Sequence, residues 1–157
     1  MGITPVSELP TRVPAGRRLL GLDLGEKTIG LALSDTLLTV ATPYETLKRG
    51  KFSEAASKIE AIAAKESVGG LVIGFPLNMD GSEGPSAQSV RAFARNFAAR
   101  SILPIALWDE RLSTAAVQRD MIAADATRKR RATSVDKVAA AYILQGALDA
   151  LRNLPPP

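Results

Sequence analysis

The sequence predicts one α/β domain built on a five-stranded mixed sheet with helices on both faces. Short, nearly continuous apolar runs indicate strands whose two faces are both buried. Three expected strands follow one another across short turns, and later strands alternate with segments of helical periodicity, in the order β-β-β-α-β-α-β-α-α. Right-handed crossovers then place the fourth strand beside the first and the fifth beside the fourth.

The first half of the chain contains three expected strands and one helix. Residues 19–24 are an apolar run, residues 25–27 supply a turn, and residues 29–33 complete a hairpin. A third strand is expected around residues 38–44. Helical spacing then begins after Ser53, which is the expected N-cap. The apolar positions of this helix are Ala55, Ile59, Ile62 and Ala63.

In the second half, strands and helices alternate. Residues 71–75 form a buried strand that Pro76 ends, and a glycine-containing loop over residues 78–84 follows. The next helix has an apolar face, made of Val90, Phe93, Ala94 and Phe97. Residues 102–108 are the fifth expected strand.

Two further helices are expected after the fifth strand. The first begins at Ser113 or Thr114 and continues through Val117 and Met121. The second begins at Ser134, after a basic stretch, and runs almost to the end of the chain.

The two ends of the chain differ in composition from this domain, which we place at residues 18–152. Residues 1–17 contain three prolines and no apolar period, so we expect a flexible leader. Residues 153–157 end in three prolines and are expected to be a disordered tail. There is no run of eighteen apolar residues and no secretory signal, so we expect neither a membrane span nor secretion.

Composition restricts the chemistry available to the chain. It contains no Cys and no His, which excludes thiolate metal sites, the usual zinc ligands and catalysis by a Ser-His-Asp triad. A bound metal must therefore be held by oxygen ligands, which suits Mg²⁺, Mn²⁺ and Ca²⁺. Twenty basic against sixteen acidic residues give a net charge of +4, which favours a polyanionic partner.

Three carboxylates stand in surroundings that predict burial. Asp23 lies within the first apolar run, and Glu110 directly follows the last one. Asp136 precedes Ala140 and Ile143 at helical spacing, which places it on the packed side of the last helix. A buried carboxylate is costly unless it is paired or binds a metal, and a divalent cation also relieves the repulsion between several of them. We therefore expect the three to converge on Mg²⁺ or Mn²⁺ at the carboxyl ends of the parallel strands.

Each carboxylate also has a simpler interpretation. Asp23 could be a structural acid, hydrogen-bonded by the turn at residues 25–27. Glu110 could form an exposed ion pair with Arg111. Asp136 suits the first turn of a helix because of the helix dipole alone. One shared metal site accounts for all three acids together, which three separate explanations do not.

Four segments, in order within residues 19–151, resemble the YqgF/RuvX family. The first is Gly-Leu-Asp-Leu-Gly-Glu-Lys-Thr-Ile-Gly-Leu-Ala-Leu-Ser-Asp at residues 21–35. It is followed by Ile-Gly-Phe-Pro-Leu-Asn-Met-Asp-Gly-Ser-Glu-Gly at 73–84, Asp-Glu-Arg-Leu-Ser-Thr at 109–114 and Val-Asp-Lys-Val-Ala-Ala-Ala-Tyr-Ile-Leu-Gln at 135–145. The resemblance implies a ribonuclease H-like fold, related to Holliday junction resolvases. It also implies a bacterial cytoplasmic nuclease that trims the precursor of 16S ribosomal RNA and associates with the ribosome. The family's acidic site falls on Asp23, Glu110 and Asp136.

These residues predict metal-dependent hydrolysis of phosphodiester bonds. In sites of this kind two divalent ions, roughly 4 Å apart, activate a water and stabilise the leaving oxygen. Asp23 is expected to bridge the ions, with Glu110 and Asp136 completing their ligand shells. The cations expected to contact phosphate groups are Lys27, Arg111, Arg128, Lys129, Arg130 and Arg131.

Three other functions remain open at this point. The protein could be a Holliday junction resolvase that acts on branched DNA, or a non-catalytic RNA-binding factor in ribosome assembly. The third alternative is an ATPase of the actin and sugar-kinase type, whose phosphate loop resembles residues 23–25, although such enzymes need two domains. A monomer and a homodimer are both compatible with the sequence.

Overall fold

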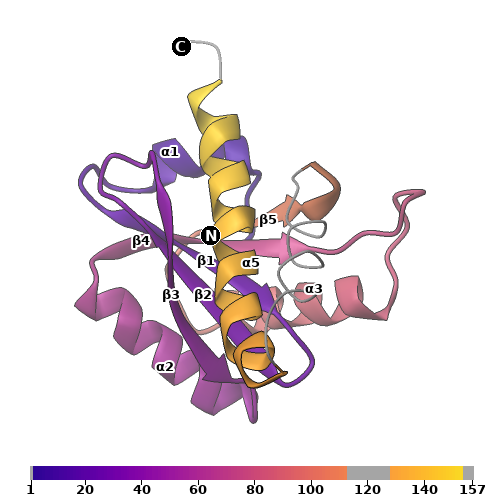
Figure 1. The fold of residues 1–157 in the computed structure, drawn as a ribbon. Helices are drawn as coiled ribbons and strands as arrows, with labels where there is room; N and C mark the ends of the chain where they lie inside the picture. The colour runs from indigo at the N-terminus through magenta and orange to yellow at the C-terminus, as the bar shows by residue number, and fades with distance from the viewer. Residues whose placement is uncertain (1, 113–127, 154–157) are drawn as a thin grey trace.

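The computed structural model describes residues 2–112 and 128–153, and describes the side chains of the last helix from Lys137 onwards. Five strands form one mixed sheet in the order β3-β2-β1-β4-β5 (Figure 1). The strands are β1 (Arg18–Leu24), β2 (Thr28–Ser34), β3 (Ala41–Lys48), β4 (Val68–Phe75) and β5 (Ile105–Asp109). β1, β2 and β3 pair antiparallel, whereas β1, β4 and β5 are parallel. The predicted strand order and mixed sheet are confirmed.

Helices cover both faces of the sheet, as the sequence predicts (Figure 1). One face carries α2 (Phe52–Lys65) and α3 (Pro85–Ala98), and the other carries α1 (Leu9–Arg12) and the long α5 (Arg128–Arg152). Short 3₁₀ turns precede α1 (η1, Val6–Glu8) and follow β5 (η2, Glu110–Leu112). None of the helices in the described part of the chain has both the length and the apolar character needed to cross a membrane.

Alternation along the central strands sorts their side chains between the two layers. Leu22 and Ile73 belong to the core under α2 and α3. Leu19 and Val72 belong to a second core under α5. The apolar character of both faces explains why these strands read as continuous apolar runs in the sequence.

Some element boundaries differ from the prediction. β3 lies at the sheet edge and begins at Ala41, with Leu47 as its one buried side chain, so the apolar pattern marks it poorly. β5 begins after Pro104, and Ile102 is 85% exposed rather than part of the strand. α2 begins at Phe52 with Lys51 as N-cap, so the expected cap at Ser53 lies inside the helix.

The last helix also begins earlier than predicted. α5 begins at Arg128, so the expected N-cap, Ser134, lies within it, and the basic run at residues 128–131 forms its first turn rather than a loop. Arg, Lys and Ala all favour helices, which extends the helix beyond its apolar pattern. The helix expected through Val117 and Met121 lies outside the described residues, as do residues 154–157 of the expected tail.

The described residues 2–17, which the sequence predicts to be a flexible leader, include positions that pair with the sheet and pack against it. Ile3 forms a parallel bridge to Ile105 at the outer edge of β5. The Thr4 N–H donates to the Ile105 carbonyl at 2.7 Å, and the Ile105 N–H donates to the Gly2 carbonyl at 3.0 Å. Leu9 is fully buried in the core under α5. Pairing with β5 and packing under α5 therefore position a segment that its prolines and lack of apolar periodicity did not indicate as structured.

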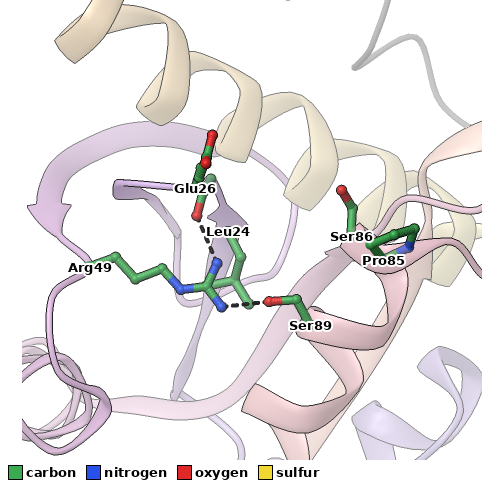
Figure 2. Close-up of a pocket in the computed structure, with 7 residues that line it drawn as sticks. Leu24, Glu26, Arg49, Pro85, Ser86 and Ser89 are labelled. Carbon is green, nitrogen blue, oxygen red and sulfur yellow. Dashed lines mark hydrogen bonds between the residues drawn. The ribbon is translucent and has the colours of Figure 1, made fainter.

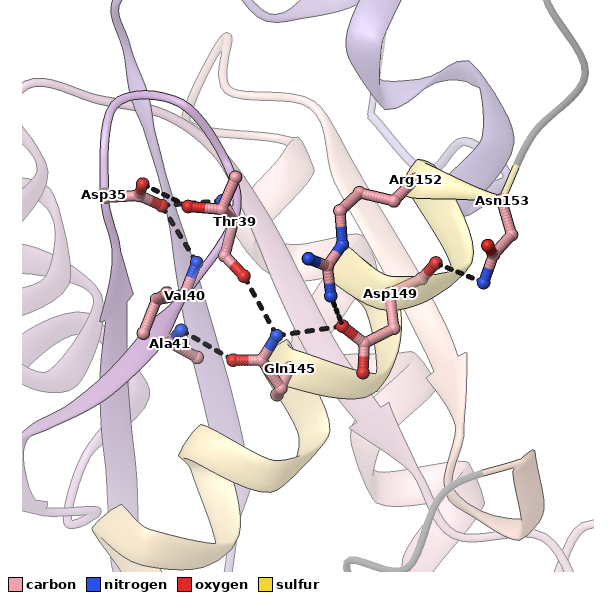
Figure 3. A network of polar contacts seen from close by, with 8 residues as sticks. All are labelled: Asp35, Thr39, Val40, Ala41, Gln145, Asp149, Arg152 and Asn153. Atoms are coloured by element: carbon pink, nitrogen blue, oxygen red, sulfur yellow. Dashed lines mark hydrogen bonds and ion pairs between the residues drawn. The ribbon is translucent and has the colours of Figure 1, made fainter.

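A polar network joins the β2–β3 loop to α5 on the same side of the sheet (Figure 3). Asp35 accepts hydrogen bonds from the Thr39 N–H at 2.7 Å, the Thr39 hydroxyl at 2.5 Å and the Val40 N–H at 3.0 Å. The Gln145 side chain accepts from the Ala41 N–H at 2.9 Å and donates to the Thr39 carbonyl at 3.0 Å. Gln145 thus fixes where α5 lies along the antiparallel half of the sheet.

Candidate active site

Asp23 lies near the carboxyl end of β1 and is 8% exposed. Its partner in the antiparallel register with β2 is Gly30. Successive side chains of a strand alternate, so Asp23 shares a face with Leu19 and Gly21, the face covered by α5. An added Cβ at Gly21 would lie 2.7 Å from Leu144 Cβ and 3.1 Å from the Ala140 carbonyl oxygen. The missing side chain at Gly21 therefore lets α5 lie directly on β1 beside Asp23.

Glu110 is the first residue after β5 and is also 8% exposed. Its carboxyl carbon would lie 3.3 Å from a Cβ added at Gly74 of β4, and Ile143 of α5 borders the same point. The Glu110 carboxylate therefore lies over Gly74, on the face covered by α5. A side chain at Gly74 would occupy the space that Glu110 fills.

The strand register brings these two carboxylates together. Leu22 of β1 pairs with Ile73 of β4, so Asp23 and Gly74 are the next residues along two adjacent strands. Adjacent strands lie ~4.8 Å apart. Asp23 and the Glu110 carboxylate over Gly74 thus share one face at the carboxyl ends of β1, β4 and β5. The predicted burial of both acids is confirmed.

The third predicted acid, Asp136, lies on α5 one turn before Ala140, and its side chain is outside the described part of the chain. The same is true of the side chains of Arg128, Lys129, Arg130 and Arg131. Among the described side chains, no group of three or more acids that could hold a metal ion is found. The convergence of Asp136 with Asp23 and Glu110 therefore stays a prediction.

Two buried carboxylates at the ends of parallel strands fit a hard divalent cation. Both supply oxygen ligands, and the chain has no His or Cys that would favour a softer metal. Their shared face also places two like charges in a weakly solvated region, where a cation lowers the electrostatic cost. The donor set suits Mg²⁺ or Mn²⁺.

Arg111 contacts Asp109 rather than Glu110. Its Nε donates to Asp109 Oδ1 at 3.1 Å, and its Nη2 donates to Oδ2 at 2.8 Å. This ion pair holds the pKa of Asp109 below its usual value, chiefly through the hydrogen bonds from Arg111. Arg111 also donates to the Met79 carbonyl at 3.4 Å, so it joins the loop at residues 78–84 to the end of β5. The sequence interpretation considered Glu110 as the partner of Arg111, and the structure shows an ion pair of Arg111 with Asp109.

A cavity of about 410 Å³ opens beside Asp23, between the β1–β2 turn and the first turn of α3 (Figure 2). Its lining residues are Leu24, Gly25, Glu26, Arg49, Pro85, Ser86 and Ser89. Lys27 lies in the same turn and is exposed. Arg49 was not among the predicted site residues. A single arginine after an edge strand has no sequence signal, because only tertiary packing brings it to this cavity.

Comparison with known proteins adds the family context. The model of the family described as "RuvX: Holliday junction resolvase" matches residues 17–150. A protein of Paramagnetospirillum magneticum named "Putative pre-16S rRNA nuclease" is 58% identical over 149 residues, covering 95% of this chain and 96% of its own. A protein of Roseobacter denitrificans with the same name is 60% identical over 142 residues, covering 89% and 87% of the two chains.

A solved structure shares the fold at low sequence identity. Thermus thermophilus RuvC in complex with a Holliday junction substrate superposes with a TM-score of 0.51 at 16% identity, covering 87% of this chain and 96% of that one. This likeness concerns the fold alone. It agrees with the ribonuclease H-like architecture that the sequence motifs imply.

Proposed function

Because this chain belongs to the RuvX family of Holliday junction resolvases, we propose that it is a metal-dependent nuclease that processes the precursor of 16S ribosomal RNA. Relatives named as pre-16S rRNA nucleases, at 58% and 60% identity over nearly the whole chain, support hydrolysis of phosphodiester bonds and this RNA substrate. The observation that carries the proposal is the pair of buried carboxylates, Asp23 and Glu110, on one face at the strand ends. Such a substrate places the protein in the cytoplasm, in association with the assembling ribosome.

The residues proposed to hold Mg²⁺ or Mn²⁺ are Asp23, Glu110 and Asp136. A bound divalent cation supplies Lewis acidity and a nucleophilic water at neutral pH, which the chain needs because it has no His to act as a base. Asp23 and Glu110 are rigid ligands, since each is buried at the end of a paired strand. Asp136 completes the set from α5.

Cations around the carboxylates are proposed to bind the phosphate backbone. Lys27 is exposed in the β1–β2 turn, and Arg111 is held at the end of β5 by Asp109. The first turn of α5 adds Arg128, Lys129, Arg130 and Arg131. Contacts of this kind position a nucleic acid without reading its sequence.

The test is cleavage of a labelled pre-16S rRNA fragment by the purified protein, with and without Mn²⁺ or Mg²⁺. We expect cleavage only with the metal, and we expect Asp23→Asn to abolish it. Loss of a ligand to the cation removes several kcal/mol of transition-state stabilisation, equivalent to a rate decrease on the order of 10³-fold or more. Glu60→Gln is the matched control and should cleave as the wild type does, because Glu60 is an acid that pairs with Arg100 at the amino end of β1, away from the carboxylates. Full activity of Asp23→Asn would refute the assignment.

A second candidate substrate is a four-way DNA junction, which the family description favours. Parallel reactions with the RNA fragment and the junction separate the two candidates. Preferential, metal-dependent cleavage of the junction assigns resolvase activity instead. Binding of RNA without cleavage under any metal condition would indicate a non-catalytic assembly factor.

A further inference from the structure

The cavity beside Asp23 opens at the carboxyl end of β1, the same end of the sheet at which the carboxylates lie. Leu24 and Gly25, which form one wall, directly follow Asp23 in the chain. Ser86 and Ser89 of α3 form the opposite wall. Arg49 lies between them (Figure 2).

Arg49 is held in place by neutral groups. Its Nη1 donates to the Gly25 carbonyl at 2.7 Å, and its Nη2 donates to Ser89 Oγ at 2.8 Å. Its backbone N–H donates to the Lys27 carbonyl at 2.9 Å. A guanidinium has about five N–H donors, and two bonds leave donors for an anion. Within the described part of the chain, the Arg49 guanidinium forms no ion pair, so its charge is positioned but not neutralised.

A second cavity also contains an arginine, but there the arginine forms an ion pair. It has a volume of about 400 Å³, lies at the amino end of β1 and is lined by Arg17 and Arg100. There Arg100 forms an ion pair with Glu60 at 2.7 Å. Glu26 lines the cavity beside Asp23, but it is exposed and forms no ion pair with Arg49. The Arg49 guanidinium is therefore held by hydrogen bonds at the edge of an open cavity, as expected of an arginine that binds phosphate.

The helix that borders the cavity adds to this charge. α3 begins after Gly84, which provides no side-chain cap for the first turn. The N-terminal end of a helix carries a partial positive charge that favours an anion. Ser86 lies in this turn and is exposed at the cavity.

We propose that this cavity binds a backbone phosphate of the nucleic acid next to the one that is cleaved, with Arg49 as the positioning residue. This inference rests on the proposed nuclease function, because it assigns the cavity to the same substrate. Arg49 acts by fixing the strand over Asp23 and Glu110. It does not contact the reacting atoms.

The test measures binding rather than cleavage. A labelled single-stranded RNA fragment is titrated with the intact protein in EDTA at several salt concentrations. Neutralising one phosphate contributes about 0.7 to the slope of log K against log salt for a single strand. We expect Arg49→Gln to weaken binding several-fold and to reduce the slope by about this amount, and Arg49→Lys to retain the slope.

Two further variants distinguish the loss of a phosphate contact from a general disturbance of the fold. Arg17→Gln removes an arginine from the cavity at the opposite end of the sheet and should bind with the wild-type slope. Ser86→Asp puts a carboxylate at the rim of the proposed site, where an acid in a helix first turn favours folding. It should lower affinity and slope together, so the test remains decisive if Arg49→Gln fails to fold.

A wild-type slope in both Arg49→Gln and Ser86→Asp would overturn the proposal. So would equal loss of affinity in Arg49→Gln and Arg49→Lys with an unchanged slope, because that pattern indicates a structural role. Neither measurement depends on cleavage. A protein that shows the slope change but never cleaves RNA or DNA would refute the nuclease proposal while leaving the phosphate site intact.

Discussion

The two faces of the sheet are built from alternating residues of the same strands but differ towards the carboxyl ends of β1 and β4. Towards α2 and α3, β1 and β4 present large apolar groups such as Leu22 and Ile73, both fully buried. Towards α5, the same strands present Gly21, Asp23 and Gly74. On the first face, large side chains fill the space between the sheet and the helices. On the second face, glycines leave space for α5 and two carboxylates to lie close to the backbone of the strands.

This difference separates stability from chemistry within one sheet. Burial of large aliphatic side chains supplies most of the folding free energy. Buried like charges oppose folding, and small residues contribute little to it. We therefore expect substitution of the large side chains towards α2 and α3 to change mainly the free energy of unfolding, and substitution of Gly21, Asp23 or Gly74 to change mainly geometry and activity.

The largest expected effect tests the face towards α2 and α3. Leu22→Ala removes a fully buried side chain and should lower the free energy of unfolding by about 2–5 kcal/mol. Urea unfolding measures this loss. Asp23→Asn, one residue away on the other face, is the control and should unfold at the wild-type midpoint or above. The division between faces fails if folded Leu22→Ala loses its cleavage activity as completely as Asp23→Asn.

A smaller effect tests how closely α5 lies on β1. Gly21→Ala places a Cβ 2.7 Å from Leu144 Cβ and 3.1 Å from the Ala140 carbonyl, so α5 must shift. Overpacking of this kind costs about 1–3 kcal/mol. Trp108, the single tryptophan, lies in the core under α5 and reports the shift by fluorescence. Native fluorescence should change in Gly21→Ala and stay constant in folded Leu22→Ala, and an unchanged spectrum in both would contradict the packing described here.

The smallest expected effect concerns Asp35 in the β2–β3 loop, which is hydrogen-bonded to α5 through Gln145. Hydrogen bonds, first from the Thr39 hydroxyl and then from the Val40 N–H, lower the pKa of Asp35 to about 2. Because the folded-state pKa lies below the usual carboxyl value, this stabilisation is present above about pH 4 and is lost as the pH falls towards 2. The partly exposed site limits the effect to less than about 1 kcal/mol.

Unfolding midpoints between pH 2 and 5 measure this contribution. Asp35→Asn should be less stable than the wild type at pH 5 and should differ less from it at pH 2. A constant difference across the range would show that ionised Asp35 does not stabilise the loop.

The elements that sequence reasoning places well are those with a strong internal pattern. β1 and β4 are continuous apolar runs because both of their faces are buried, and their predicted positions are close to those observed. The predicted bounds of β3 are displaced because seven of its eight residues are not fully buried and follow no apolar alternation. The packing of Leu9 was missed because its partners come from β1 and α5, far along the chain.

In the candidate site, too, some residues could be predicted from the sequence and one could not. Asp23 and Glu110 could be recognised because a carboxylate inside or beside an apolar run signals an energetic conflict. Arg49 carries no such signal, since an arginine after an edge strand is ordinary in a sequence. Its meaning depends on the hydrogen bonds to Gly25 and Ser89, which pairing across the sheet and α3 create.

The bridge between Ile3 and Ile105 has a consequence for synthesis of the chain. The segment that contains Ile3 precedes β1 in the chain, yet its partner strand β5 is translated only after β1, β2, β3 and β4. Until then the segment cannot form its two hydrogen bonds to Ile105, and afterwards it occupies the backbone groups at the start of the outer edge of β5, where another chain could otherwise pair. Pairing of the segment with Ile105 is therefore a late event in the folding of the chain.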